Sequence, residues 1–486
     1  MSYKKFLSFV AITTLASSII LTGCGASSAT SATSSTVTTT EATSSDDSTE
    51  ATEYFTERDV DYSYDESSAT KVTLSDGETY TISEEGVYIF SGSVTDAQIV
   101  VDANETDKVQ IVLDGPTMTN ESTACIYGLN ADKIFITTAD GSTNSLSVTG
   151  EYVAIDDNNI DGVIFSKTDV TLNGGGTLNI EGASGHGVVS KDDLKVTCGN
   201  YNISVAKKGL EGKESVRIGG GSINITECYE GIESQEIILV DGEINITASD
   251  DGINAVSADD SSNNDGMAAD GVSSITILGG TLYINASGDS IDSNNDLTIS
   301  GGTIYVDGPM DSANGALDYA GSGTITGGTI FAVGSSGMAQ NMGSDSTQGC
   351  ILVNLQSNES GEIQLLDSDG NVIASYTPSK SYSSVLVSTA GIEDGATYTL
   401  VTGSTSTEIT MDGLIYGSGG MMGGGFGGGR MGGGRGQMGE MPSDGNFQPG
   451  QMPQDGQMPE PPEGEAPSGD FQPGQRPDMN ESTESN

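Results

Sequence analysis

The chain lacks tryptophan and has a single histidine and few basic residues. Its 17 lysine and arginine residues stand against 69 aspartate and glutamate residues, which gives a formal net charge of −52. Such a chain repels the phosphates of nucleic acid, so we expect no nucleic-acid partner. Because His186 is the only histidine, a serine–histidine–aspartate hydrolase has no alternative base here, and zinc ligation is disfavoured. The strong negative charge attracts cations, so a cation is the expected kind of charged ligand.

Long hydrophobic runs are also scarce, and the clearest one lies near the N-terminus. It follows Lys4 and Lys5 and is too short for a comfortable transmembrane helix. Residues 1–23 therefore predict a lipoprotein signal peptide. The letters LTGC at positions 21–24 resemble a bacterial lipobox, in which a lipid is attached to the cysteine sulfur. We expect lipidation of Cys24 and a lipid-anchored location on the extracellular face of the bacterial membrane, with a plain signal peptide as the alternative.

Two further segments lack the apolar residues that a folded core requires. Residues 24–70 are rich in serine and threonine, which predicts a flexible tether. Residues 417–486 consist of glycine, methionine and proline runs, which predict a disordered tail. The folded part of the chain is therefore expected between these segments.

A loose repeat of about 22 residues is the main feature of that folded part. Each copy holds a strand, a Gly-Gly corner, a second strand and a turn that ends in an apolar residue, as in VRIGGGSINITECYEGIES and ITILGGTLYINASGDSIDS. One copy cannot close its own core, so consecutive copies must stack. We predict an all-β fold, with a right-handed parallel β-helix solenoid over residues 71–345 and a small β cap over residues 346–416. We expect a monomer.

Cysteine is scarce after the predicted lipidation site. The remaining cysteines show no CxxC spacing, and Cys198 and Cys228 fall at different positions of the repeat. A disulfide along the solenoid is therefore not predicted. We expect Cys125, Cys198, Cys228 and Cys350 to be unpaired small apolar side chains.

Each copy also places one side chain outward between two inward apolar residues. Asn224, Asn245, Tyr283 and Tyr305 occupy this position. Stacked tyrosines of adjacent copies form a surface on which a sugar ring can pack, so Tyr283 and Tyr305 are candidate carbohydrate-binding residues. Tyrosines on neighbouring strands also pack simply on each other, which is the alternative.

The turn after the second strand carries two rows of polar residues. The turn row is His186, Lys208, Glu230, Asp251 and Asp289, and the strand row, three positions further on, is Glu211, Glu233, Asn254 and Asp292. Two carboxylates about 5 Å apart repel by roughly 3 kcal/mol at an effective dielectric constant near 20, so such rows raise one another's pKa or recruit a cation.

Oxygen ligands alone favour Ca²⁺ over zinc or copper. We therefore predict Ca²⁺ ligands among Glu230, Glu233, Asp250, Asp251, Asn254, Asp289 and Asp292. Asp259, Asp260 and Asp265 lie in an acidic insertion that could close over the ion. The alternative is a solvated acidic surface whose Asn and Asp residues were selected for turns.

Several segments, among them GVYIFSGSVTDAQIVVDA, VIFSKTDVTLNGGGTLNIEG and ASDDGINA, resemble the clostridial-type calcium-dependent carbohydrate-binding domain proteins. The resemblance spans roughly residues 72–413. It implies a right-handed β-helix similar to polysaccharide lyases, Ca²⁺ at Asp-Gly-Ile turns, and binding of cellulose-like and acidic plant polysaccharides such as polygalacturonate. The turn at Asp251 keeps this motif, whereas His186, Lys208 and Glu230 replace its Asp and Ser290 replaces its Gly.

Three functions follow as hypotheses. The first is a cell-surface lipoprotein that binds polysaccharides through a calcium-bearing face and has no catalytic residue. The second is a calcium-dependent uronate lyase that uses Lys207 or Lys208 as base, although these lysines could simply pair with Glu211 or Glu230. The third is a structural adhesin that calcium only stiffens.

Overall fold

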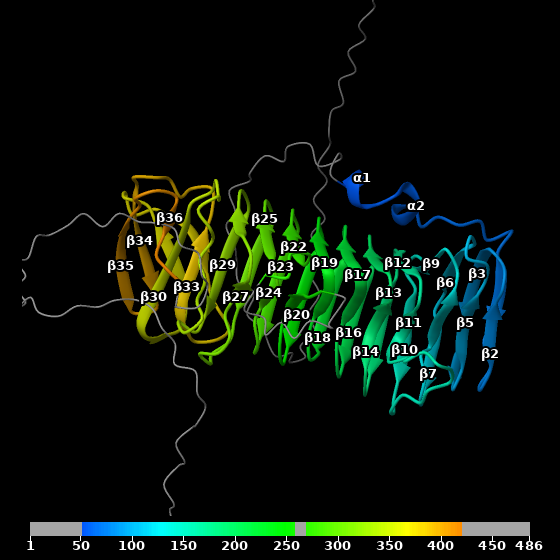
Figure 1. Ribbon diagram of the computed structural model, residues 1–486. Coiled ribbons are helices and arrows are strands. Elements are labelled where there is room, and N and C mark those ends of the chain that lie inside the picture. The colour runs from blue at the N-terminus through cyan, green and yellow to red at the C-terminus, as the bar shows by residue number, and fades with distance from the viewer. Residues whose placement is uncertain (1–50, 258–268, 420–486) are drawn as a thin grey trace, which may run out of the picture. The chain divides into compact units, whose positions relative to one another are not determined.

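The computed structural model describes residues 51–257 and 269–419 (Figure 1). Cys24, the predicted signal peptide, the insertion residues Asp259, Asp260 and Asp265, and the tail from residue 420 lie outside the described residues. Within the described ranges the helices are the short α1 (Ala51–Tyr54) and α2 (Glu57–Val60), and the other elements are strands. Neither helix is long or apolar enough to cross a bilayer. The prediction of an all-β chain is confirmed.

The strands stack in parallel on three faces, each strand pairing with the equivalent strand of the next copy. Face 1 contains β1 (Thr70–Thr73), β3 (Gly86–Ser91), β6 (Lys108–Leu113), β9 (Lys133–Thr138), β12 (Asp169–Gly174), β15 (Asp193–Val196), the ends of β17 (Leu210–Ile218) and β19 (Ile232–Leu239), β22 (Ser274–Ile277), β25 (Asp296–Ile299) and β28 (Gly323–Ile325).

Face 2 is a second stack of parallel strands, with one strand from each copy. It contains β2 (Thr79–Ile82), β5 (Gln98–Asp102), β8 (Ile126–Asn130), β11 (Gly162–Ser166), β14 (His186–Ser190), the starts of β17 and β19, β21 (Ile253–Ala255), β24 (Ile291–Ser293) and β27 (Leu317–Tyr319). Faces 1 and 2 join through β17 and β19 into one 19-stranded sheet.

Face 3 is a separate sheet. It contains β4 (Ser93–Thr95), β7 (Thr117–Asn120), β10 (Thr143–Val148), β13 (Thr177–Gly182), β16 (Asn200–Val205), β18 (Ser222–Glu227), β20 (Glu243–Ala248), β23 (Thr281–Ala286), β26 (Thr303–Asp307) and β29 (Thr329–Gly334). Parallel stacking of successive copies on three faces is consistent with a β-helix-like solenoid (Figure 1).

The core is built from apolar rows that run through successive copies. On face 3, Ile223 pairs with Ile244, which pairs with Leu282, and all three are buried. The Gly-Gly corners before these strands need glycine. Gly280 has φ +78°, and a Cβ there would lie 2.7 Å from the carbonyl oxygen of Gly242. The repeat thus fixes both the inward apolar row and the corner that precedes it.

The C-terminal strands extend and cover face 3. β33 (Tyr382–Ser388) pairs antiparallel with β29, and β30 (Cys350–Glu359) pairs with β33 and with β36 (Ile415–Tyr416). β31 (Ile363–Leu366), β32 (Val372–Tyr376), β34 (Thr397–Thr402) and β35 (Thr405–Thr410) form a four-stranded antiparallel sheet. β33 pairs with β29, the last parallel strand of face 3, and so leaves it no open edge on that side.

The segment around α2 is fastened to face 1. Asp59 is fully buried; its carboxylate lies 2.6 Å from Nζ of Lys133 and 3.5 Å from Nζ of Lys195, and accepts a hydrogen bond from the hydroxyl of Thr171 at 2.9 Å. Phe55 packs against Ile238 and Val240 of face 1. These contacts hold part of residues 24–70, the segment for which the sequence predicted a flexible tether. The sequence did not reveal them, because the contacted residues lie far away in the chain.

The four cysteines of the described ranges are free. Cys125, Cys228 and Cys350 are buried, and Cys198 is half-buried. Burial raises the pKa of each of the three buried thiols to about 12, so they are poor nucleophiles. The expectation of unpaired cysteines is confirmed for the structure described here.

Candidate functional site

Backbone hydrogen bonds align the turn row of successive copies. In each case the amide of the residue after a row member donates to the carbonyl oxygen of the next member. The pairs are Gly187–Lys208 at 2.9 Å, Gly209–Glu230 at 3.0 Å, Gly231–Asp251 at 3.1 Å and Gly252–Asp289 at 3.0 Å. The row predicted from the repeat is therefore continuous at the start of face 2.

The strand row is also continuous and extends one residue further than the sequence predicted. Its paired members are Glu211, Glu233, Asn254, Asp292 and Asp318. Sequence reasoning missed Asp318 because the turn before it carries Gly315 and Ala316 rather than an acidic residue. The apolar residue before it, Leu317, which pairs with Ile291, was the available signal.

Three carboxylates lie close together between the first two copies whose turn-row residue is acidic. Glu230, Asp250 and Asp251 each place an oxygen within 4.8 Å of the others. Glu230 is only 9% exposed, and its Oε2 accepts no hydrogen bond from any described residue; the same holds for Oδ1 of Asn254. A buried oxygen without a donor is costly, so this group is suited to a cation that supplies the missing positive charge.

Burial changes the protonation of these side chains. It raises the pKa of Asp251 to about 6, that of Asp289 to about 7 and that of Asp292 to about 8, and neighbouring carboxylates add to each shift. Burial and the adjacent Glu233 likewise raise the pKa of Glu230. Near neutral pH the rows therefore keep protons unless a cation neutralises them.

The early copies neutralise their carboxylates internally. Lys208 forms ion pairs with Glu233 and, at 3.9 Å, with Glu211; Nδ1 of His186 lies 3.1 Å from Glu211. Burial would lower the pKa of Lys208, but Glu233 and Glu211 raise it overall, so the amine stays charged. No described basic residue forms an ion pair with Asp251. The carboxylates without basic partners thus lie in the later copies.

A second group of carboxylates, which the sequence analysis did not single out, lies on face 1. Asp192, Asp193 and Glu214 place oxygens within 4.8 Å of one another. The hydroxyl of Ser215 donates to Asp193 at 2.6 Å, and Arg217 lies 3.9 Å from the same carboxylate. Asp193 thus has protein partners of its own, unlike Oε2 of Glu230.

The outward row of face 3 changes character along the solenoid. Its paired members are Asn179, Asn202, Asn224, Asn245, Tyr283, Tyr305 and Phe331. The rings of Tyr283 and Tyr305 stack with centroids 4.9 Å apart at 21°. Tyr283 is 38% exposed, but Tyr305 is only 8% exposed because Tyr376 of β32 stacks on it at 4.6 Å. Of the two tyrosines predicted to bind sugar, Tyr283 is therefore the one with an available ring.

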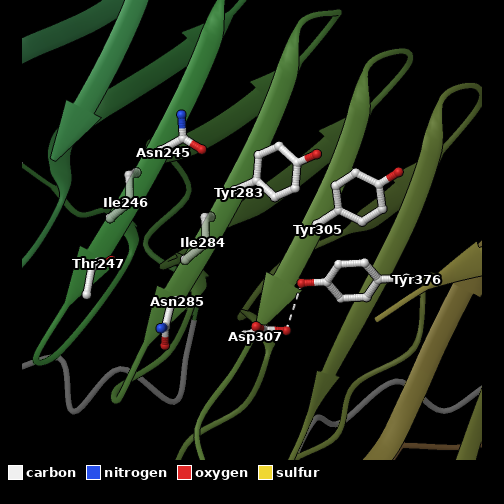
Figure 2. Close-up of a pocket in the computed structure, with 9 residues that line it drawn as sticks. All are labelled: Asn245, Ile246, Thr247, Tyr283, Ile284, Asn285, Tyr305, Asp307 and Tyr376. Atoms are coloured by element: carbon white, nitrogen blue, oxygen red, sulfur yellow. Dashed lines mark hydrogen bonds between the residues drawn. The ribbon is translucent and has the colours of Figure 1, made fainter. Parts of the chain in front are cut away.

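A cavity of about 150 Å³ lies beside these rings (Figure 2). Its walls come from β20, β23 and β26 and from Tyr376 of the four-stranded sheet. The side chains at its rim are Asn245, Thr247, Tyr283, Asn285, Tyr305, Asp307 and Tyr376. The cavity combines aromatic surface with amide, hydroxyl and carboxylate groups, the combination that pockets for small polar ligands use.

Comparisons with known proteins found similarity over part of this chain. Residues 76–312 match a family model described as "Carbohydrate-binding domain-containing protein". A protein of that description from Acetivibrio thermocellus is 37% identical over 124 residues, 25% of this chain and 43% of that protein. The chain thus matches less than half the length of this curated relative. A solved structure, a gadolinium derivative of the polysaccharide lyase-like protein from C. thermocellum, is 29% identical with a TM-score of 0.40, covering 53% of this chain and 96% of that one.

Proposed function

We propose that the protein binds acidic polysaccharides, of which polygalacturonate is the test case, through Ca²⁺ held by the turn and strand rows. The observation that carries the proposal is the cluster of Glu230, Asp250 and Asp251, whose oxygens lie within 4.8 Å of one another, together with the buried Oε2 of Glu230, to which no described residue donates a hydrogen bond. The similarity of residues 76–312 to a carbohydrate-binding family supports a glycan as the ligand.

The residues fit Ca²⁺ by their chemistry. The donors are carboxylate and amide oxygens, which Ca²⁺ prefers and which zinc and copper do not. Glu230, Asp250, Asp251 and Asn254 would hold one ion, and Asp289, Asp292 and Asp318 provide further oxygens in the next copies. When bound, the ion would neutralise these carboxylates and attract the carboxylate of a uronic acid. Glu233, also predicted as a ligand, forms an ion pair with Lys208.

The finer features of the sequence interpretation belong to the same proposal. We infer a right-handed parallel β-helix, a monomer, and lipidation at Cys24 that holds it on the extracellular face of the membrane. Right-handed winding is supported by the general preference for right-handed crossovers between parallel strands. The lipid anchor is supported by the lipobox-like sequence, which lies outside the described residues.

The protein is proposed to be a binder rather than a lyase. A lyase base has to accept a proton, whereas the partners of Lys208 keep its amine charged. We expect no ultraviolet-absorbing unsaturated product after long incubation with pectate and Ca²⁺. Accumulation of such a product, lost in a Lys208→Met variant, would establish the lyase instead.

Polygalacturonate binding should depend on calcium and on the turn row. We expect measurable affinity with Ca²⁺ and at least a tenfold loss, about 1.4 kcal/mol, with a chelator or in Asp251→Asn. The substitution removes one charge but keeps an acceptor for the amide of Asp289, which donates to Asp251 Oδ1 at 2.7 Å. Titration calorimetry gives the affinities.

Glu243→Gln is the matched control for this experiment. Glu243 is an exposed carboxylate at the start of β20, outside both rows, so its removal tests for a general effect of surface charge. Equal weakening in Glu243→Gln and Asp251→Asn would count against the calcium site. A protein that chelation destabilises, but that binds no uronate polymer, would be the calcium-stiffened adhesin.

A further inference from the structure

We propose that face 3 carries a second glycan site that captures the end of a neutral, β-linked polysaccharide chain, with the terminal ring stacked on Tyr283. The site is separate from the carboxylate rows, which lie at the start of face 2. The proposal shares with the proposed function only the premise that the ligand is a polysaccharide. It rests on a platform, a wall and an open row of amides.

The platform is the ring of Tyr283, which is both exposed and held in place. Beside it, on the neighbouring strand, Tyr305 stacks with its centroid 4.9 Å away, and Tyr376 stacks on Tyr305 at 4.6 Å (Figure 2). The apolar face of a sugar ring packs on an aromatic face, because contact removes apolar surface of both from water. A ring already held by a stacked neighbour loses little conformational freedom when the sugar arrives.

The wall consists of Tyr376, the last residue of β32, and the chain that follows it, and it closes one end of the cavity. The hydroxyl of Tyr376 donates to Asp307 Oδ1 at 2.9 Å, and the amide of Ser379 donates to Asp307 Oδ2 at 2.7 Å. The amine of Lys380 donates to the carbonyl oxygen of Ala286 at 2.5 Å. These bonds attach the wall to the ends of β23 and β26, so a polysaccharide cannot continue past Tyr305 along the row.

The other side of Tyr283 stays open and is lined by amides. Asn245, Asn224 and Asn202 precede Tyr283 in the same outward row, one per copy. Strand spacing places them about 4.8 Å apart, comparable to the advance of an extended β-linked glycan per ring. An amide carries both donors and an acceptor, as hydroxyl groups require; that of Asn202 already donates to Asn179 Oδ1 at 2.9 Å. Among the described residues, the side-chain amides of Asn224 and Asn245 form no hydrogen bond.

The charges around the cavity favour a neutral sugar. No lysine or arginine lines the cavity, and Lys380 in the wall already donates to the carbonyl oxygens of Ala286, Asp307 and Gly308. Both oxygens of Asp307 accept hydrogen bonds from Tyr376 and Ser379. The cavity thus offers a uronate no free positive partner, whereas hydroxyl groups can bond to Asn245, Thr247 and Asn285.

The test compares glucan samples that differ in their number of chain ends. The full protein, kept in chelator, is mixed with soluble mixed-linkage β-glucan before and after partial cleavage by an endo-acting glucanase, and the protein bound per gram of glucan is measured. We expect the bound amount to rise in proportion to the new chain ends. Binding that stays constant or falls after cleavage would show recognition of internal segments and overturn the proposal.

Variants link this readout to the platform. Tyr283→Ala should weaken cellohexaose binding at least about tenfold, Asn245→Ala should weaken it several-fold, and Tyr283→Phe should bind like the unchanged protein. Asn245→Ala removes an amide without disturbing the ring stack, so it guards against a folding defect in Tyr283→Ala. Unchanged cellohexaose affinity in both alanine variants would also overturn the proposal.

A substitution at one site should weaken binding of that site's ligand only. Asp251→Asn should lose polygalacturonate binding and keep cellohexaose binding, whereas Tyr283→Ala should show the reverse. Loss of cellohexaose binding on chelation would place the neutral sugar at the calcium rows and contradict a separate site. Absence of polygalacturonate binding alone would remove the proposed function and leave the chain-end site standing.

Discussion

Replacing Asp59 by asparagine should lower the free energy of unfolding by about 3–5 kcal/mol, the usual cost of removing one partner of a buried ion pair. The Asp59 carboxylate is fully buried and contacts Lys133 and Lys195, which are themselves buried. Asparagine keeps the shape but leaves both amines without their nearest negative charge. The segment around α2 should then detach from face 1. Urea unfolding followed by circular dichroism measures the change.

Asp61→Asn is the matched control, because Asp61 is exposed and lies two residues further along the chain. It should change stability by no more than about 0.5 kcal/mol. Equal stability of Asp59→Asn and Asp61→Asn would mean that the buried pair contributes nothing to holding the segment. Increased proteolysis between residues 53 and 70 in Asp59→Asn alone would locate the detachment.

The ion pairs of Asp59 also predict how the free energy of unfolding changes at acidic pH. Burial would raise the pKa of Asp59, but the hydrogen bond and charge of Lys133 outweigh it and hold the pKa well below its usual value. A depressed folded-state pKa contributes stability above the unfolded pKa of about 4, and this contribution is lost as the pH falls further. The stability difference between the unchanged protein and Asp59→Asn should therefore shrink below pH 4.

Calcium should produce the second large effect, a rise in stability of about 2.7 kcal/mol when its concentration is 100 times the dissociation constant. Glu230→Gln should remove most of this gain, because the variant lacks the buried charge that faces Asp250 and Asp251. Thermal unfolding with Ca²⁺ and with chelator measures it. Asp192→Asn, in the second group of carboxylates, should leave the gain intact. A gain that Glu230→Gln keeps in full would place the ion elsewhere.

This stabilisation should depend on pH in a defined direction. The folded-state pKa values of Asp251, Asp289 and Asp292, about 6, 7 and 8, exceed the unfolded value. The folded protein without calcium therefore binds more protons than the unfolded chain and loses stability as the pH rises from about 4 to 8. Calcium must displace those protons, so its gain should be larger at pH 8 than at pH 5. A gain that is greatest at pH 5 would contradict the assignment.

The repeat allowed much of the candidate site to be predicted from the sequence. A period that stacks one copy on the next places equivalent residues in rows, so Glu230, Asp251 and Asp289 could be aligned without coordinates. The sequence analysis did not identify Asp318, because the turn before it lacks the acidic residue that identified the other copies. The burial of Tyr305 could not be predicted either, because Tyr376, which covers it, belongs to a sheet outside the repeat.

The sequence by itself determined the strands, the parallel stacking and the order of charges along the turn row, because these depend on local alternation and on a short period. Only the tertiary structure decided which carboxylates have basic partners, that Asp59 is buried against two distant lysines, and that the tyrosine row ends at a wall. Those features join residues far apart in the chain. Their energies depend on burial and on distances between atoms, which no repeat pattern contains.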